Sequence, residues 1–347
     1  MSLDDIRNKA REQLKGVCGV YKICDGDLMG RICQGQSYGR PIGIGGIGSG
    51  ASFENNIKAL SKIRLKMRLI GPHFEPDTNM TLFGKPISMP ILGGSVSGVN
   101  SFGGEKVITE KEFCRAVVVG CQEAGTIGFR GDTYTYSLDE TPGLDAIREA
   151  GGWGVKISKP REQSVMIEYF KRAEQIGCIA VGTDVEGCGS SIMAKYNKPV
   201  FRKSVEDLRE LVSCTSLPFI VKGIMTIEDA EAAIDAGASA IVVSNHGGRV
   251  LDHTPGTAEV LPEIVDAVKG KITILADSGV RTGFDVLKML ALGADAVLIG
   301  RDIVRAAVGG GSEGVRIQME YLQKILKRAM LMTDCPTLKD ITPDILC

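Results

Sequence analysis

The chain of 347 residues contains 44% hydrophobic and 24% charged residues, a composition typical of folded globular proteins and not of disordered or fibrous ones. Its 41 basic and 42 acidic side chains give a formal net charge of −1, which leaves no excess positive field for nucleic-acid binding. An acidic start and the lack of any apolar run of about 18 residues argue against a secretion signal or a membrane partner and predict a cytoplasmic protein. Ten cysteines scattered through so large a chain favour reduced thiols.

Residues 1–86 are expected to form an N-terminal cap made of helix and loop. A charged amphipathic helix is predicted at about residues 3–15, followed by a stretch rich in cysteine and glycine and then by a basic segment that ends near residue 69. Cys18, Cys24 and Cys33 lie in this stretch, but they lack the close Cys-x-x-Cys pairing typical of metal and iron–sulfur sites. No metal is therefore predicted, and a site completed by a fourth ligand stays a minor alternative.

From residue 85 onward, apolar runs of about five residues alternate with amphipathic stretches of about 10 to 15, which indicates repeated βα units. Eight such units close most naturally into a single (β/α)8 TIM barrel over residues 87–347, with a long C-terminal helix. The predicted strands are 87–92, 126–130, 154–157, 179–183, 219–222, 240–244, 272–276 and 296–300. The predicted helices are 109–124, 139–150, 163–176, 204–213, 226–236, 257–268, 282–292 and 312–332.

Polar residues at the carboxyl ends of the predicted strands point to a catalytic site, because these ends face the active site of such a barrel. His246 follows the sixth strand and precedes two glycines, which allow a ligand to approach the backbone closely. Arg249 could hold a carboxylate through two hydrogen bonds, and Asp184, at the end of the fourth strand, could hold the imidazole. We therefore predict His246 as a base, Asp184 as its partner and Arg249 as the carboxylate ligand, with a structural histidine as the alternative.

The segments after the last two strands, 277–281 and 300–301, stand where barrels commonly bind phosphate through backbone amides and a helix N-terminus. They imply a phosphorylated cofactor. Lys222, at the end of the fifth strand, would place an ammonium in the barrel mouth, where it could steady negative charge on a reduced ring. The long connection 184–204 stands where a lid would be found, and a variable surface loop is the alternative reading.

Residues 221–302 closely resemble the FMN-dependent 2-hydroxy-acid oxidase/dehydrogenase family, which includes glycolate and lactate oxidases. Asn-His-Gly-Gly-Arg at 245–249 is the specific part, and Lys-Gly-Ile at 222–224, Asp-Ser-Gly-Val-Arg at 277–281 and Gly-Arg at 300–301 accompany it. The resemblance implies an enzyme that oxidises an L-2-hydroxy acid to the 2-oxo acid, passes electrons to O2 or another carrier, and forms a homotetramer. By the same resemblance, FMN would be bound by Gly93, Gly94, Ser95, Lys222, Ser244, Gly247, Asp277, Ser278, Gly279, Arg281, Gly300 and Arg301.

The chain departs from this family on the substrate side. The family grips the substrate carboxylate with a second arginine and two tyrosines, and a glutamine and a threonine lie beside its flavin. The corresponding positions here hold Ser191, Gly46, Lys156, Gly154 and Gly182. The candidates that would replace the lost carboxylate contacts are Lys156 and the loop cations Lys195, Lys198 and Arg202.

Two other functions stay open at this point. A non-redox flavin barrel that resembles isopentenyl diphosphate isomerase shares the fold and the phosphate site, but it would not need the pair of His246 and Arg249. A barrel that binds FMN or another phosphate ligand without turnover is suggested by the lost substrate contacts.

Overall fold

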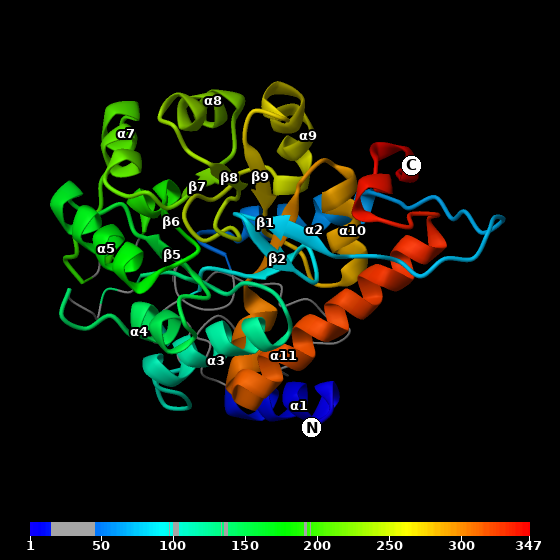
Figure 1. The fold of residues 1–347 in the computed structure, drawn as a ribbon, viewed down its shortest axis with the longest axis horizontal. Coiled ribbons are helices and arrows are strands. Elements are labelled where there is room, and N and C mark those ends of the chain that lie inside the picture. The colour runs from blue at the N-terminus through cyan, green and yellow to red at the C-terminus, as the bar shows by residue number, and fades with distance from the viewer. Residues whose placement is uncertain are drawn as a thin grey trace.

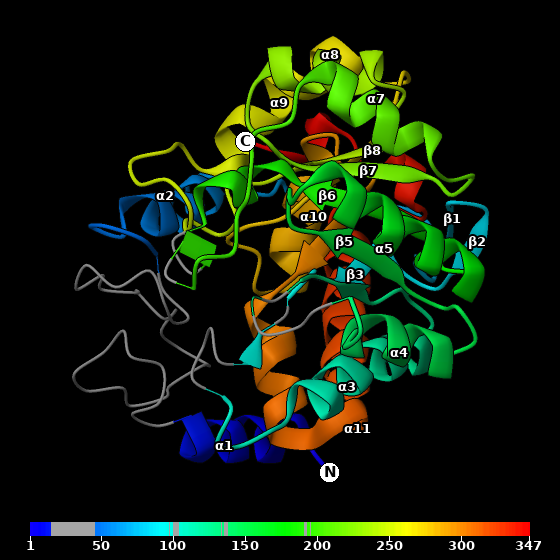
Figure 2. The same cartoon turned by 90° about the vertical axis from the view of Figure 1, so that its left-hand side faces the viewer.

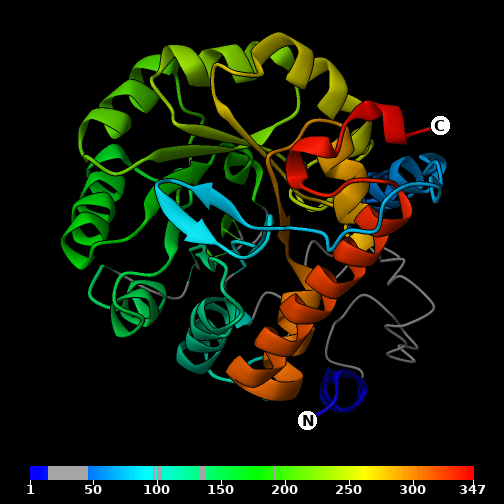
Figure 3. The same ribbon diagram turned by 45° about the vertical axis from the view of Figure 1, so that its right-hand side comes forward.

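The computed structural model describes residues 1–14, 46–96, 98–99, 104–132, 134, 138–190, 193–194 and 196–347. Within these residues, eight parallel strands form a barrel that helices surround (Figures 1 and 3). Neighbouring strands follow the order β3-β10-β9-β8-β7-β6-β5-β4, and a parallel bridge between Gly93 and Gly128 closes the ring. The predicted (β/α)8 barrel is thus confirmed. Its strands are β3 (Ile91–Gly93), β4 (Phe129–Arg130), β5 (Val155–Ser158), β6 (Ala180–Asp184), β7 (Phe219–Ile224), β8 (Ala240–Val243), β9 (Thr273–Ala276) and β10 (Ala296–Ile299).

The interior of the barrel is filled by apolar side chains, which alternate along each strand with side chains that face the helices. On β5, Val155 and Ile157 belong to this interior cluster. The antiparallel hairpin of β1 (Met80–Leu82) and β2 (Lys85–Ile87) lies across one end of the barrel, where it packs apolar side chains into the same cluster (Figure 3). The functional side chains described below therefore lie at the other end, which the carboxyl ends of the strands form.

The first predicted strand, 87–92, is wrong as a single element, because the structure divides it between two sheets. Ile87 pairs with Met80 in the hairpin, whereas Ile91 pairs with Val297 in the barrel. Pro90 lies between them and has no N–H to donate to a ladder, so the change of partner falls there. The other seven predicted strands all overlap observed ones.

Helices cover the outside of the barrel, and Figure 2 shows α5, α7, α8 and α9 following one another outside β5 to β8. Capping boxes begin several of them, such as Thr109 with Glu112 and Ser204 with Asp207, which explains why the predicted starts agree with the observed ones. The helices are α3 (Glu110–Glu123), α4 (Pro142–Glu149), α5 (Gln163–Ile176), α7 (Val205–Ser213), α8 (Ile227–Asp235), α9 (Thr257–Val268), α10 (Gly283–Ala291) and α11 (Arg301–Met332).

The last helix, α11, differs from its prediction at the start. It was expected over 312–332, but helical structure begins directly after β10 at Arg301 and is interrupted at Gly311, where φ is 60° and ψ is −145°. The interruption leaves a first helical segment whose N-terminus faces the barrel mouth. This is the arrangement expected for a phosphate site after the eighth strand.

The described part of the predicted cap packs on the barrel. Helix α1 (Leu3–Leu14) lies beside the first half of α11, where Ile6 and Ala10 are fully buried (Figures 1 and 3). Helix α2 (Ala51–Lys62) was not predicted, and it packs against α9 near the mouth of the barrel. Among the described helices, none combines the length and the apolar character that a membrane span requires.

Candidate functional site

The loop after β8 carries His246 and turns sharply at the carboxyl end of the barrel. His246, Gly247 and Gly248 all have left-handed backbone conformations, with φ of 57°, 65° and 78°. Ser244 Oγ accepts a hydrogen bond from the His246 N–H at 3.1 Å, and Ser278 Oγ accepts one from the Gly247 N–H at 3.0 Å. Because left-handed backbone is uncommon for a residue other than glycine, these bonds fix the histidine in one place.

The cap helix α2 anchors this loop, a contact that no sequence pattern predicted. Asn56 and Asn245 exchange two side-chain hydrogen bonds of 2.9 and 3.1 Å, and both are buried. Gly248 allows the close approach, because a Cβ there would lie 2.4 Å from the backbone nitrogen of Phe53. The cap therefore positions the loop that carries the predicted base.

The imidazole of His246 lies among carboxylates and lysines from neighbouring strands. Its Nδ1 is 2.8 Å from Glu186 Oε1, 3.7 Å from Asp184 Oδ2 and 3.5 Å from Lys222 Nζ. The structure thus brings the predicted pair of Asp184 and His246 together, but Glu186 lies nearer to the ring. Sequence reasoning missed Glu186, which belongs to the short 3-10 helix η2 (Val185–Gly189) directly after β6.

Two ion pairs flank the histidine. Lys159, in the loop after β5, pairs with Asp184, and Lys222 pairs with Glu186. Asp184 and Lys222 are register partners on β6 and β7, which explains why the charges meet. Because ammonium groups already contact these carboxylates, we assign them to ion pairs rather than to metal ligands.

The surroundings keep His246 in its neutral form. Burial, and then the positive charges of Lys222 and Lys159, lower the pKa of His246 well below its ordinary value, against the opposing charge of Asp184. Burial alone would lower the pKa of Lys222 as well, but the carboxylates of Glu186, Asp277 and Asp184 raise it above its ordinary value. The site therefore combines a neutral imidazole with the charged ammonium of Lys222, as a base at neutral pH requires.

Arg249 brings a further positive charge to the same loop. Its Nε is buried without a hydrogen-bond partner among the described residues, and no acidic side chain of the described residues forms an ion pair with it. Burial lowers the pKa of Arg249, which means that its charge lacks compensation. A guanidinium in this condition is suited to receive a carboxylate from a ligand.

The segments predicted to bind phosphate lie together beside this loop. Ser278 and Gly279 have φ of 75° and 85°, and Gly300 stands at the N-terminal end of α11 without any side chain that caps the helix. Arg301 donates a hydrogen bond of 2.9 Å to the carbonyl of Gly247, which ties the last strand to the histidine loop. The uncapped N–H groups and the positive end of the helix dipole favour an anion at this point.

The loop after β3 completes this side of the mouth. The Gly94 N–H donates to the carbonyl of Ile299 at 2.8 Å, and a Cβ on Gly94 would lie 2.9 Å from that same oxygen. Gly93, Gly94 and Ser95 are therefore backbone neighbours of β10, as a cofactor site shared by the two loops requires. Farther along the same loop, Glu110 accepts hydrogen bonds from the N–H groups of residues 98 and 99.

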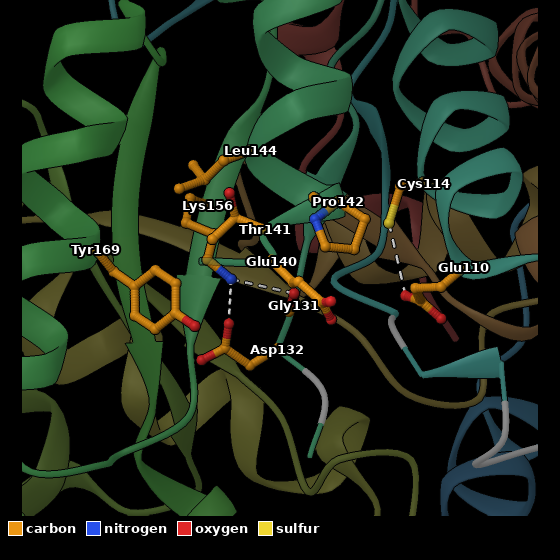
Figure 4. Close-up of a pocket in the computed structure, with 11 residues that line it drawn as sticks. Glu110, Cys114, Gly131, Asp132, Glu140, Thr141, Pro142, Leu144, Lys156 and Tyr169 are labelled. Carbon is orange, nitrogen blue, oxygen red and sulfur yellow. Dashed lines mark hydrogen bonds and ion pairs between the residues drawn. The ribbon is translucent and has the colours of Figure 1, made fainter. Parts of the chain in front are cut away.

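Lys156 lies elsewhere than expected. It stands between two residues of the barrel interior, so its side chain emerges on the helix side of β5, where it pairs with Asp132 and lies over the ring of Tyr169 at 5.2 Å (Figure 4). Among the lysines of this strand and its loop, Lys159 is the one that reaches the carboxylates around the histidine. The pocket in Figure 4 is lined by Glu110, Cys114, Gly131, Asp132, Glu140, Thr141, Pro142, Gly143, Leu144, Lys156 and Tyr169.

Steric crowding explains why glycine stands at two of the positions where the chain departs from the family. A Cβ on Gly182 would lie 2.2 Å from the carbonyl oxygen of Ile220, and one on Gly154 would lie 2.7 Å from the side chain of Ile147. Lys198 and Arg202 are exposed. The remaining predicted positions, Cys18, Cys24, Cys33, Ser191 and Lys195, lie outside the described residues.

The residues at the mouth fit a phosphorylated cofactor together with an anionic substrate. The N-terminus of α11 and the glycine-rich backbone at 93–94, 247–248 and 279 offer amide donors with little side-chain bulk. A Cβ on Gly247 would lie 2.6 Å from Arg301 Nη1, so only glycine lets the arginine stay beside the loop. The uncompensated Arg249 supplies the separate charge that a substrate anion needs.

Comparison with known proteins gives the same picture. The model of a family described as FMN-dependent dehydrogenase matches residues 43–190 and 186–347. A peroxisomal (S)-2-hydroxyacid oxidase of Arabidopsis thaliana is 31% identical over 86% of this chain and 88% of its own length. The 2-hydroxyacid oxidase 1 of Homo sapiens is 32% identical over 84% of this chain and 88% of its own length.

Solved structures agree with these matches. A mandelate oxidase structure superposes with a TM-score of 0.79 at 28% identity, covering 100% of this chain and 97% of that one. A mandelate oxidase variant that carries an FMN adduct superposes with a TM-score of 0.74 at 32% identity, over 87% of this chain and 93% of that one.

Proposed function

Because the chain belongs to the FMN-dependent dehydrogenase family and is an FMN enzyme of the 2-hydroxy-acid oxidase type, we propose that it oxidises an L-2-hydroxy acid to the 2-oxo acid. The observation that supports this substrate class is the neutral His246 in the same short loop as an uncompensated Arg249. A 2-hydroxy acid offers its hydroxyl proton to His246 and its carboxylate to Arg249.

His246 acts as the base in this proposal. Its Nδ1 is engaged by Glu186, so Nε2 is the ring atom left to take the hydroxyl proton of the substrate. Arg249 holds the carboxylate and thereby orients the carbon that is oxidised. FMN, when bound, accepts the two electrons and the hydrogen that leave that carbon.

The cofactor would be held at two places. The N-terminus of α11 and the neighbouring arginines would hold its phosphate, and the loop after β3 and the ammonium of Lys222 would contact its ring. The residues proposed for these contacts are Gly93, Gly94, Ser95, Lys222, Ser244, Gly247, Asp277, Ser278, Gly279, Arg281, Gly300 and Arg301.

Three further properties belong to the proposal. The substrate is an acid like lactate or glycolate or a larger one, and small acids should bind weakly because the second arginine and the tyrosines that grip the carboxylate in the family are replaced. The electron acceptor is O2 or another carrier. The protein acts as a homotetramer in the cytoplasm.

Anaerobic reduction tests the proposal. A panel of L-2-hydroxy acids is added to the yellow, FMN-loaded protein without oxygen, and bleaching of the flavin band is recorded. Recovery of the colour on admitting O2 indicates an oxidase, and persistent bleaching indicates a dehydrogenase that uses another carrier. A protein that no 2-hydroxy acid bleaches would contradict the proposal and favour an isomerase or a binding protein.

The variant Arg249→Lys separates carboxylate binding from cofactor binding. Lysine cannot offer the planar pair of donors, so we expect at least about tenfold weaker substrate binding with FMN content unchanged. Arg209→Lys is the matched control, because Arg209 is exposed on α7. Equal substrate affinity of both variants would contradict the role of Arg249.

A further inference from the structure

Glu186 is a second carboxylate at the base, and neither the sequence pattern nor the proposed reaction required it. Its side chain is 8% exposed, and Oε1 contacts both His246 Nδ1, at 2.8 Å, and the ammonium of Lys222. The other oxygen, Oε2, is buried without a hydrogen-bond partner among the described residues. A buried carboxylate that is only half satisfied is costly, so its position needs an explanation.

The backbone leaves room for this carboxylate. A Cβ on Gly223 would lie 2.1 Å from Glu186 Oε2, and Gly223 has a φ of 106° within the irregularity where β7 shifts register against β8. The same irregularity follows Lys222 directly. Strand β7 thus presents the lysine to Glu186 and also makes space for the glutamate.

Asp184 is less well placed to serve the histidine. Its Oδ2 pairs with Lys159 and lies 3.7 Å from His246 Nδ1, beyond hydrogen-bond distance. Glu186, in contrast, lies within hydrogen-bond distance of the ring. The two carboxylates therefore have different partners, although only one residue separates them in the chain.

We propose that Glu186 is the positioning residue of this site: it holds Nδ1 of His246 in the catalytic orientation and at the same time balances the charge of Lys222 beside the cofactor. This inference rests on the proposed function. When His246 takes the hydroxyl proton, the imidazolium that forms keeps its Nδ1–H on Glu186, which stabilises the new positive charge. No other proton moves in this step.

The link to Lys222 has a second consequence. A lysine paired with a glutamate presents little net charge to the flavin, whereas a lysine left only with the more distant Asp277, at 3.9 Å, would better stabilise the negative charge of reduced FMN. Glu186 therefore lowers the reduction potential of the bound cofactor while it assists the base. The glutamate connects the proton-accepting and electron-accepting sides of the site.

The first test compares Glu186→Gln with Asp184→Asn by their pH profiles. We expect Glu186→Gln to lower kcat by about 100-fold with KM nearly unchanged, because the contribution falls in the transition state. The acid limb of kcat/KM should also move to lower pH, because the imidazolium loses its nearest negative charge. The charged groups that face or adjoin this ring are Lys159, Asp184, Glu186, Lys222, Arg249, Asp277 and Arg301, and the substitution alters only one of them.

The second test measures the reduction potential of bound FMN by equilibration with a redox dye, which needs no substrate. We expect a more positive potential in Glu186→Gln and the wild-type value in the control Glu206→Gln, whose side chain is 79% exposed. If no 2-hydroxy acid reduces the wild-type protein, the proposed function fails, but this potential still decides the role of Glu186.

The overturning results are specific. A larger loss of kcat in Asp184→Asn than in Glu186→Gln, with the acid limb of the latter unchanged, would assign the histidine to Asp184. An unchanged potential in Glu186→Gln would refute the balance with Lys222. If Glu186→Gln does not retain FMN, Glu186→Asp replaces it: the charge stays but the reach shortens, so kcat should fall while the potential stays near wild type, and a wild-type kcat would overturn the proposal.

Discussion

Replacing Asn56 of α2 by alanine should destabilise the protein far more than the same change at its neighbour Asn55. The Asn56 amide makes three buried hydrogen bonds: it donates to Asn245 Oδ1 at 2.9 Å, and it accepts from Asn245 Nδ2 and from the Thr257 N–H, both at 3.1 Å. At about 1 kcal/mol net for each bond, their loss costs about 3 kcal/mol. Asn55 makes a single bond of 2.8 Å, to the carbonyl of Thr254, so its replacement should cost about 1 kcal/mol.

Urea denaturation of the FMN-loaded proteins measures the difference. We expect a clearly lower midpoint for Asn56→Ala at an unchanged slope, and kcat/KM should fall with it because Asn245 adjoins His246. The reasoning would be refuted if the free energies of unfolding of Asn56→Ala and Asn55→Ala agreed within about 0.5 kcal/mol, since the buried pair would then contribute nothing. The expected larger stability loss in Asn56→Ala, if turnover stayed unchanged, would refute only the link between α2 and catalysis.

Two further predictions concern charge. Burial alone would raise the pKa of Asp252, but hydrogen bonds from Ser49 lower it to about 2, so its stabilising effect is present above the unfolded-state pKa of about 4 and is lost as the pH falls toward 2. The stability difference between wild type and Asp252→Asn, measured by thermal unfolding, should therefore be constant near neutral pH and shrink between about pH 4 and 2; a constant difference down to pH 2 would contradict this. A 2-hydroxy monocarboxylate should reduce FMN at least about tenfold faster than its dicarboxylate analogue, because Lys159 and Lys222 are already paired and cannot neutralise a second carboxylate beside Asp184 and Glu186. Stopped-flow reduction checks this, and faster reduction by the dicarboxylate would contradict the charge assignment.

The barrel itself could be predicted from the sequence because the patterns that define its strands and helices lie within short segments of the chain. Apolar runs, capping residues and glycines repeat with each βα unit, and they identify seven of the eight barrel strands without knowledge of any contact. The loop at 245–249 could be found for the same reason, since its residues are consecutive. The prediction of the first strand failed at Pro90, where the sequence stays apolar but the chain changes its pairing partner from β1 to β10.

Asp184 was predicted as a partner of the histidine, but the nearer partner, Glu186, could not be, because it depends on side-chain direction at the end of β6. Asp184 and Glu186 stand two positions apart, and only the turn of the chain after β6 decides which carboxylate reaches Nδ1. Lys156 leaves β5 on its helix side, whereas Lys159 lies in the loop beyond the strand, where the alternation of side chains along β5 no longer applies. Asn56 is separated from Asn245 by 189 positions, so no local pattern connects them.

The charges at the mouth explain how the site can function without the arginine and tyrosines of its relatives. Lys159 and Lys222 also bring positive charges to the site. Each is already paired with a carboxylate, so neither offers much attraction to a substrate anion. Arg249 is matched by no carboxylate of the described residues and is half-buried, so a carboxylate that reaches it gains a charge-assisted interaction. We therefore propose that substrate recognition falls mainly on Arg249 and that the paired lysines control the base and the cofactor.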